Sequence, residues 1–314
     1  MTAPAGPERG GLVDALALPE GVHAGAPHAR PGGAGLWLRR LGALLFWATI
    51  QGVFLLPAIP PLDQVLPDVS PLLGALFNLL VAAGFVWWFV LRPRARGERR
   101  RLATFRIRPV APAVARWVPL ASAAMVGVVL ASLVILPRVM AVPKSDSAFL
   151  EAYLRKPFAP IALLVLVALV APLLEEFLFR GWIQRSLERR MLPWRAILIT
   201  AVAFGLAHGD AFGLPLRVIF GVASGYAAYT TRSIWPSVVL HGAYNGSLVV
   251  LSGAMPKVDE RTLTGWAQND QVFLLALAAL AVSGSVLMLA LRAMRHAAVT
   301  ARAARVAPRR AALA

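Results

Sequence analysis

The sequence has no cysteine in its 314 residues. This absence excludes disulfide scaffolds, thiolate metal sites and cysteine nucleophiles. Charged side chains are also scarce, at 15% of the chain against 58% hydrophobic residues, whereas soluble domains hold about 25% charged residues. The mean hydropathy is +0.67. The composition therefore excludes a soluble enzyme, a fibrous protein and a disordered chain, and favours a membrane protein.

Acidic residues are few, with 15 Asp and Glu against 32 Lys and Arg and a net charge of +17. A soluble protein with this charge would suggest nucleic-acid binding, but here the basic residues cluster between apolar runs, as the positive-inside rule describes. The arginine-rich stretch 92–108 has Phe105 as its one aromatic residue. We interpret it as a topology anchor beside anionic headgroups rather than a base-stacking surface. No nucleic-acid partner is expected.

Apolar runs of about 18–20 residues are long enough to cross a bilayer as helices. The sequence predicts an all-α polytopic membrane protein with about eight transmembrane helices and a four-helix catalytic core. The predicted spans are 38–59, 72–91, 117–136, 158–178, 194–210, 215–231, 234–252 and 272–291. The lipid bilayer is therefore an expected partner.

The predicted organisation has four parts: a disordered cytoplasmic tail (1–35), three helices with a basic loop (36–156), a catalytic segment (157–252), and a last helix with a basic tail (253–314). On this assignment most Lys and Arg residues lie on the side of both termini, which predicts cytoplasmic termini. Arginine far outnumbers lysine, and Ala, Gly and Pro are abundant. This bias indicates GC-rich coding, so we expect a bacterial inner membrane.

The fourth predicted span ends in charges that an apolar helix does not normally carry. No charged residue occurs from Pro157 to Leu174, and then Glu175, Glu176 and Arg180 follow. A charge at mid-bilayer costs about 2.5–3.5 kcal/mol on insertion scales. Glu176 and Arg180 have the four-residue spacing of an intrahelical ion pair, which leaves Glu175 available for chemistry. The alternative is that the helix has reached the interface and its charges are solvated.

Two histidines also fall in or at the ends of apolar spans. Phe204 precedes His208 by four residues, and Asn245 follows His241 by four, so each pair shares a helix face. The other histidines, His23, His28 and His296, lie in the tails. A single intramembrane histidine can serve as a helix–helix hydrogen bonder. Two, with an asparagine and paired carboxylates, favour a functional cluster.

Other hydrolytic motifs are absent. The sequence has no HExxH zinc motif. It has no GxSxG elbow, because Ala223 stands where that motif needs serine. Neither Ser224 nor Ser237 has a distinctive context for a serine–histidine dyad.

The three motifs together resemble the CPBP family, which comprises type II CAAX prenyl endopeptidases and bacterial relatives linked to bacteriocin processing or immunity. The matching residues are Glu175-Glu176-x-x-x-Arg180, Phe204-x-x-x-His208 and His241-x-x-x-Asn245, with Gly181-Trp182 and Ile234-Trp235-Pro236 as context. The resemblance covers about residues 157–252. It implies an all-helical intramembrane protease that cuts a membrane-associated protein or peptide with a glutamate-activated water.

Under this resemblance Glu175 is the general base, and His208 hydrogen-bonds the water or the substrate carbonyl. His241 and Asn245 donate to the developing oxyanion. Arg180 holds Glu176, and Phe204 supports His208. No cofactor is expected; the alternative is a zinc site made by Glu175, His208 and His241.

Two other functions stay open: a non-catalytic membrane binding or immunity protein, and a transporter with an ionisable relay. A geometric difficulty also stands. If Glu175 lies at the cytoplasmic end of its span, His208 lies about 20 Å away along the fifth helix. The two can then meet only if the fifth helix begins later or tilts.

Overall fold

The computed structural model describes residues 65–66, 68–87, 105–143, 152–254 and 260–311, and the regular elements in these ranges are all helices. The all-α prediction is therefore confirmed for this part of the chain. The predicted tail 1–35 and the first predicted span, 38–59, lie outside the described residues.

Each of the seven other predicted spans coincides with a helix, but the lengths differ. The helices are α4 (Ser70–Val86), α7 (Val118–Val139), a composite helix from Ala159 to Glu188, α12 (Pro193–Leu206), α13 (Leu214–Thr231), α14 (Trp235–Ala254) and α16 (Asp270–Ala311). In the described residues, three helical segments are long and apolar enough to cross a membrane: Pro112–Val139, Ala159–Glu188 and Asp270–Ala304. The chain is an integral membrane protein, and the count of eight spans stays a prediction.

The predicted fourth span is longer than expected and is not regular. It runs for 30 residues, from Ala159 to Glu188, and is called the glutamate helix below. Its α-helical parts are α9 (Ala159–Val165), α10 (Ala171–Glu176) and α11 (Arg185–Glu188), separated by the π-helical segments η2 (Leu166–Val170) and η3 (Phe177–Gln184). The two glutamates stand at the junction of α10 and η3. Such π segments occur frequently at functional sites.

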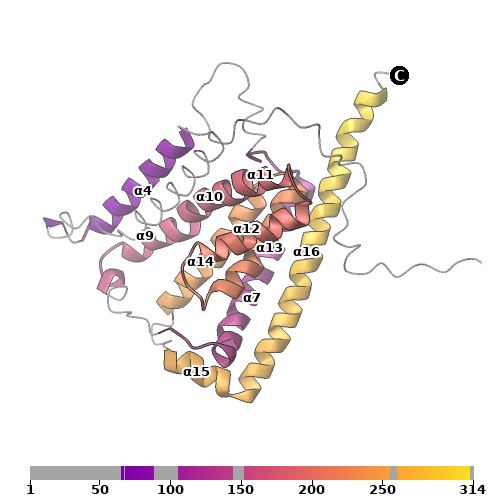
Figure 1. Ribbon diagram of the computed structural model, residues 1–314. Helices are drawn as coiled ribbons and strands as arrows, with labels where there is room; N and C mark the ends of the chain where they lie inside the picture. Colours follow the sequence, from indigo (N-terminus) through magenta and orange to yellow (C-terminus); the bar gives the residue numbers. More distant parts are fainter. Residues whose placement is uncertain (1–64, 67, 88–104, 144–151, 255–259, 312–314) are drawn as a thin grey trace, which may run out of the picture.

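The length of the glutamate helix explains how His208 can lie beside Glu175. The glutamates do not lie at the end of their helix, because the helix continues from Glu175 to Glu188, about 20 Å further along its axis. After a short turn, α12 begins at Pro193 and leads back along the glutamate helix (Figure 1). The part of the glutamate helix after Glu175 and the helix α12, which together form a hairpin, have similar lengths. His208, just beyond the end of α12, therefore returns to the level of Glu175.

The remaining helices enclose this hairpin. α16 lies along one side of the bundle against α7, whereas α4 and α9 lie together on the other side (Figure 1). α13 and α14 lie between them. Two shorter helices complete the described part: α6 (Pro112–Ala115), which leads into α7, and α15 (Glu260–Gln268), which leads into α16.

Small residues bring α14 close to the glutamate helix. Gly242 and Gly246 are four residues apart on α14, and both face Ala168 in η2. A Cβ at Gly242 would lie 2.4 Å from the carbonyl oxygen of Ala168, so only glycine permits this approach. Paired small residues at this spacing let membrane helices pack backbone to backbone. The contact fixes the depth at which the neighbouring His241 meets the glutamates.

The first prediction concerns this contact. Gly242→Ala forces α14 away from η2, and overpacking of this kind costs about 1–3 kcal/mol. Gly284→Ala in α16 is the matched control, because a Cβ there has no neighbour within 4 Å. Thermal unfolding of the detergent-purified protein should show a lower Tm for G242A and an equal or higher Tm for G284A. Equal Tm values for G242A and wild type would contradict the proposed packing constraint.

Candidate active site

The charged residues of the glutamate helix are buried. Glu175 is 5% exposed, and Glu176 and Arg180 are both 0% exposed. The alternative in which the helix reaches the interface and its charges are solvated is therefore wrong. Buried charges are costly unless they are paired, so their partners define the site.

Glu176 has two partners on its Oε1 atom. Arg180 Nη1 lies 3.2 Å from it, which is the ion pair expected from the four-residue spacing. His241 Nδ1 of α14 lies 2.9 Å from the same oxygen. One carboxylate thus connects the glutamate helix to the helix that carries the second histidine.

The Arg180 guanidinium is enclosed by aromatic rings. Its central carbon lies 4.5 Å from the ring centroid of Phe204, 5.6 Å from that of Phe220 and 5.8 Å from that of Phe179. Cation–π contacts of this kind are stronger when the cation is desolvated. Phe204 therefore supports Arg180 in addition to its place one turn before His208.

Glu175 faces both histidines. Its Oε2 lies 3.8 Å from Nε2 of His208 and 3.8 Å from Nε2 of His241. These distances exceed hydrogen-bond range, and Oε2 has no hydrogen-bond partner among the described residues. The structure thus brings together the predicted base and both predicted histidines around one carboxylate oxygen.

Each imidazole is oriented through its other nitrogen. His208 Nδ1 lies 2.8 Å from the carbonyl oxygen of Phe204, which can only accept, so Nδ1 donates and Nε2 is an acceptor in the neutral ring. His241 Nδ1 faces the Glu176 carboxylate in the same way. Both Nε2 atoms are thereby directed at Glu175.

Asn245 uses one of its two N–H groups within the bundle. Its Nδ2 donates to the carbonyl oxygen of Val167 in η2 at 2.9 Å. The π turn alters the backbone hydrogen-bond ladder there, and the asparagine side chain satisfies one of its carbonyls. Its second N–H is the one available to a substrate.

The site is most open beside His208. The His208 side chain is 21% exposed, whereas the side chains of Glu175 and His241 are 6% and 2% exposed. The adjoining turn has Gly209 at φ +66° and an Asp210–Arg217 ion pair of 2.9 Å. The connection between α12 and α13 therefore forms the accessible edge of the site.

Two aromatic residues of the site were not predicted from the sequence. Phe220 of α13 packs 4.6 Å from the His241 ring, and Tyr244 stacks on Phe220 at 5.3 Å. Tyr244 follows His241 by three residues, so the helical period could have placed it on the same face. Phe220 had no comparable signal. With α13 included, four helices surround the site.

The zinc alternative requires Glu175, His208 and His241 as ligands. Within the described ranges, no group of three or more His, Asp or Glu side chains is arranged to hold a metal ion. The two separations between an imidazole Nε2 and the Glu175 Oε2 are both 3.8 Å. No step below uses a metal.

Comparison with known proteins places the site within one family segment. Residues 157–247 match the model of the family described as type II CAAX prenyl endopeptidase Rce1-like. The Bacillus subtilis protein YdiL, classed by name as a membrane peptidase, is 29% identical over 89 residues, which are 28% of this chain and 36% of YdiL. The chain thus matches about a third of that relative. No solved structure matches.

Every predicted site residue, from Glu175 to Asn245, lies within the matched segment. The comparisons support the resemblance to the CPBP family over this segment, since residues 157–247 match the Rce1-like family model.

Proposed function

We propose that this protein is an intramembrane endopeptidase that hydrolyses a peptide bond with a water molecule activated by Glu175. The observation that carries the proposal is the convergence of two oriented imidazole Nε2 atoms on one buried, unpartnered carboxylate oxygen. An ionisable group held in this way in an apolar bundle costs stability. A catalytic role for Glu175 explains why the protein keeps this destabilising group.

The proposed reaction begins with water beside Glu175 and His208. A water lying off the line between Oε2 and Nε2 can donate one hydrogen to each acceptor, so that an oxygen lone pair faces the substrate. Glu175 takes a proton as the water oxygen bonds to the peptide carbonyl carbon. The C–N bond then breaks, and the same proton passes from Glu175 to the leaving amine.

Glu176 and Arg180 keep His241 in this geometry. Glu176 holds His241 by its Nδ1, and Arg180 balances the charge of Glu176. The Nε2 of His241, when protonated, is the donor that we assign to the developing oxyanion. Asn245 assists with its second N–H, while the first fixes η2 through Val167. A single oxyanion donor typically contributes about 2.7–4 kcal/mol.

The proposed substrate is a membrane-associated protein or peptide. The site is surrounded by apolar helices and is most open at the α12–α13 connection, so a substrate reaches it from the bilayer or its surface. We place the protein in a bacterial inner membrane with both termini in the cytoplasm, on the distribution of basic residues.

The second prediction concerns Glu175→Gln, which is nearly isosteric and removes the base. Terminal proteomics of membrane and secreted fractions should show at least one protein that is cut in wild-type cells and accumulates uncut in E175Q cells. Glu260→Gln, an exposed glutamate of α15, is the matched control and should cut normally. If a deletion has a phenotype that E175Q lacks, and no terminus changes, the non-catalytic binding or immunity function is correct instead.

The third prediction separates the two glutamates. Glu176→Gln leaves Arg180 buried without its ion partner, and breaking a buried pair costs about 3–5 kcal/mol. E175Q removes no ion pair within 3.5 Å and should unfold at the wild-type temperature or above it. Thermal unfolding of both purified variants tests this, and equal destabilisation by both would refute the division of roles.

The fourth prediction concerns metal. Because Glu175 is proposed to act as a base and not as a metal ligand, purified active protein should contain no stoichiometric zinc by elemental analysis. Its cleavage rate should be unchanged after chelator treatment and after added zinc. Loss of activity on chelation that zinc restores would establish the metal-dependent alternative.

A further inference from the structure

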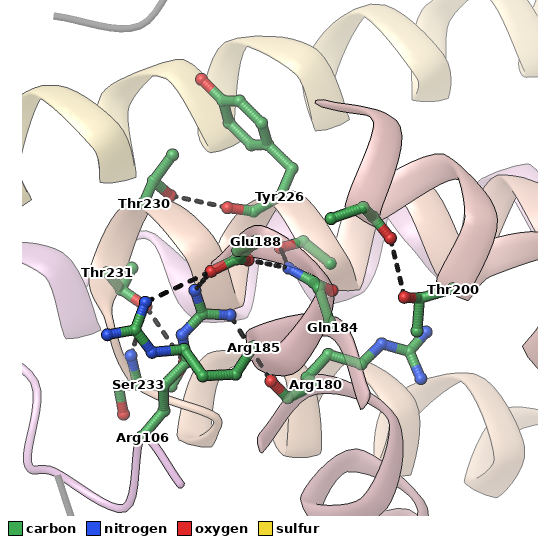
Figure 2. Close-up of polar contacts among 12 residues, drawn as sticks. Arg106, Arg180, Gln184, Arg185, Glu188, Thr200, Tyr226, Thr230, Thr231 and Ser233 are labelled. Atoms are coloured by element: carbon green, nitrogen blue, oxygen red, sulfur yellow. Dashed lines mark hydrogen bonds and ion pairs between the residues drawn. The ribbon is translucent and has the colours of Figure 1, made fainter. Parts of the chain in front are cut away.

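A second buried polar cluster lies beyond the two glutamates, at the C-terminal end of the glutamate helix, and plays no part in the proposed reaction. Its centre is Glu188, at the end of the glutamate helix, whose side chain is 2% exposed. Gln184 donates to Glu188 Oε1 at 2.9 Å and to the carbonyl oxygen of Gly225 in α13 at 2.9 Å. Arg106 pairs with Glu188 Oε2. Figure 2 shows these side chains gathered around Glu188.

Arg106 belongs to the basic stretch that the sequence analysis interpreted as a surface anchor. The structure contradicts this for Arg106, which is 3% exposed, whereas Arg108, two residues later, is exposed. The backbone of Arg106 has φ +59°, a left-handed conformation that a non-glycine residue adopts at some cost. The side chain of Arg106 is thus inserted into the bundle.

This insertion touches the glutamate helix at several points. Arg106 Nη1 makes a long hydrogen bond of 3.5 Å to the carbonyl oxygen of Arg180, whose guanidinium points the other way (Figure 2). The Phe105 ring lies 5.0 Å from that of Phe177, which directly follows Glu176. A Cβ at Gly181 would lie 2.8 Å from the carbonyl oxygen of Phe105. The segment therefore packs directly on η3.

Residues 106 and 108 of this segment also bind the two residues that precede α14. The amide of Ile234 donates to the carbonyl oxygen of Arg106 at 3.0 Å. The Ser233 hydroxyl donates to the carbonyl oxygen of Arg108 at 2.6 Å. These residues immediately precede α14, two turns before His241. One short segment thus connects the two helices whose side chains meet at Glu176.

We propose that Arg106 is a positioning residue for the active site. Through Glu188 and the Arg180 carbonyl it fixes η3, and through its own carbonyl it fixes the start of α14. The separation between Glu176 and His241 depends on the positions of both η3 and the start of α14. This inference rests on the proposed function for its effect on catalysis, but not for its effect on geometry.

The geometric test relies on spin labels attached to introduced cysteines, which are the only labelling sites because the chain has no native cysteine. Cysteines introduced at Arg190 and Trp235, both exposed, carry spin labels at the end of the glutamate helix and the start of α14. Pulsed electron resonance of the full chain in lipid nanodiscs should give one narrow distance distribution. Arg106→Gln should broaden it, and Arg108→Gln, the matched removal of a neighbouring charge, should not. Identical distributions in all three proteins would overturn the proposal.

The catalytic test compares cleavage rates in cells by pulse labelling of the protein that accumulates in E175Q. R106Q should slow cleavage about 10- to 100-fold, the scale of a displacement of about 1 Å, and R108Q should leave the rate unchanged. The double variant R106Q/E188Q removes both buried charges, so its Tm should recover relative to R106Q while cleavage stays slow. Full recovery of cleavage in the double variant would show that Arg106 serves only to neutralise the charge of Glu188. That result would overturn the positioning role.

The two readouts separate this proposal from the proposed function. If no protein accumulates in E175Q cells, the peptidase proposal fails, and the distance distribution alone decides the role of Arg106. A broadened distribution in R106Q then supports the positioning role for whatever the site does.

Discussion

The carboxylate of Glu176 is the interaction on which the rest of the site depends. It is fully buried, and one of its oxygens pairs with Arg180 on its own helix and with His241 on another. In a low-dielectric bundle each of these groups needs the others, because removal of any one leaves an uncompensated buried charge or donor. The same contact orients His241 toward Glu175. Stability and the proposed chemistry therefore depend on one oxygen atom.

The sequence could predict the composition of this site. Charges and histidines in apolar helices are costly, so Glu175, His208 and His241 stood out against their surroundings. The spacing of Glu176 and Arg180 predicted their ion pair, and the structure shows it. Hydropathy also located seven helices of the described part, because long apolar runs have few other stable conformations in lipid.

The sequence could not predict how the helices meet. Hydropathy ended the fourth span near the glutamates, because Glu175, Glu176 and Arg180 lower the local average, yet the helix continues to Glu188. The π segments change which residues share a face, and they present the Val167 carbonyl to Asn245. Arg106 resembled the other arginines of a basic loop, and its burial against Glu188 shows only in the tertiary structure. These features depend on contacts between residues distant in the sequence.

The central claim is that a peptide bond can reach the oxygen that Glu175 directs at His208 and His241. The most direct measurement is the structure, by electron cryomicroscopy, of E175Q with an uncut membrane peptide trapped in it. The account predicts that the scissile carbonyl lies within about 3.5 Å of a water beside the side chain at position 175. It also predicts that the bound peptide passes the α12–α13 connection. A peptide bound elsewhere, with residues 175, 208 and 241 closed against it, would contradict the account.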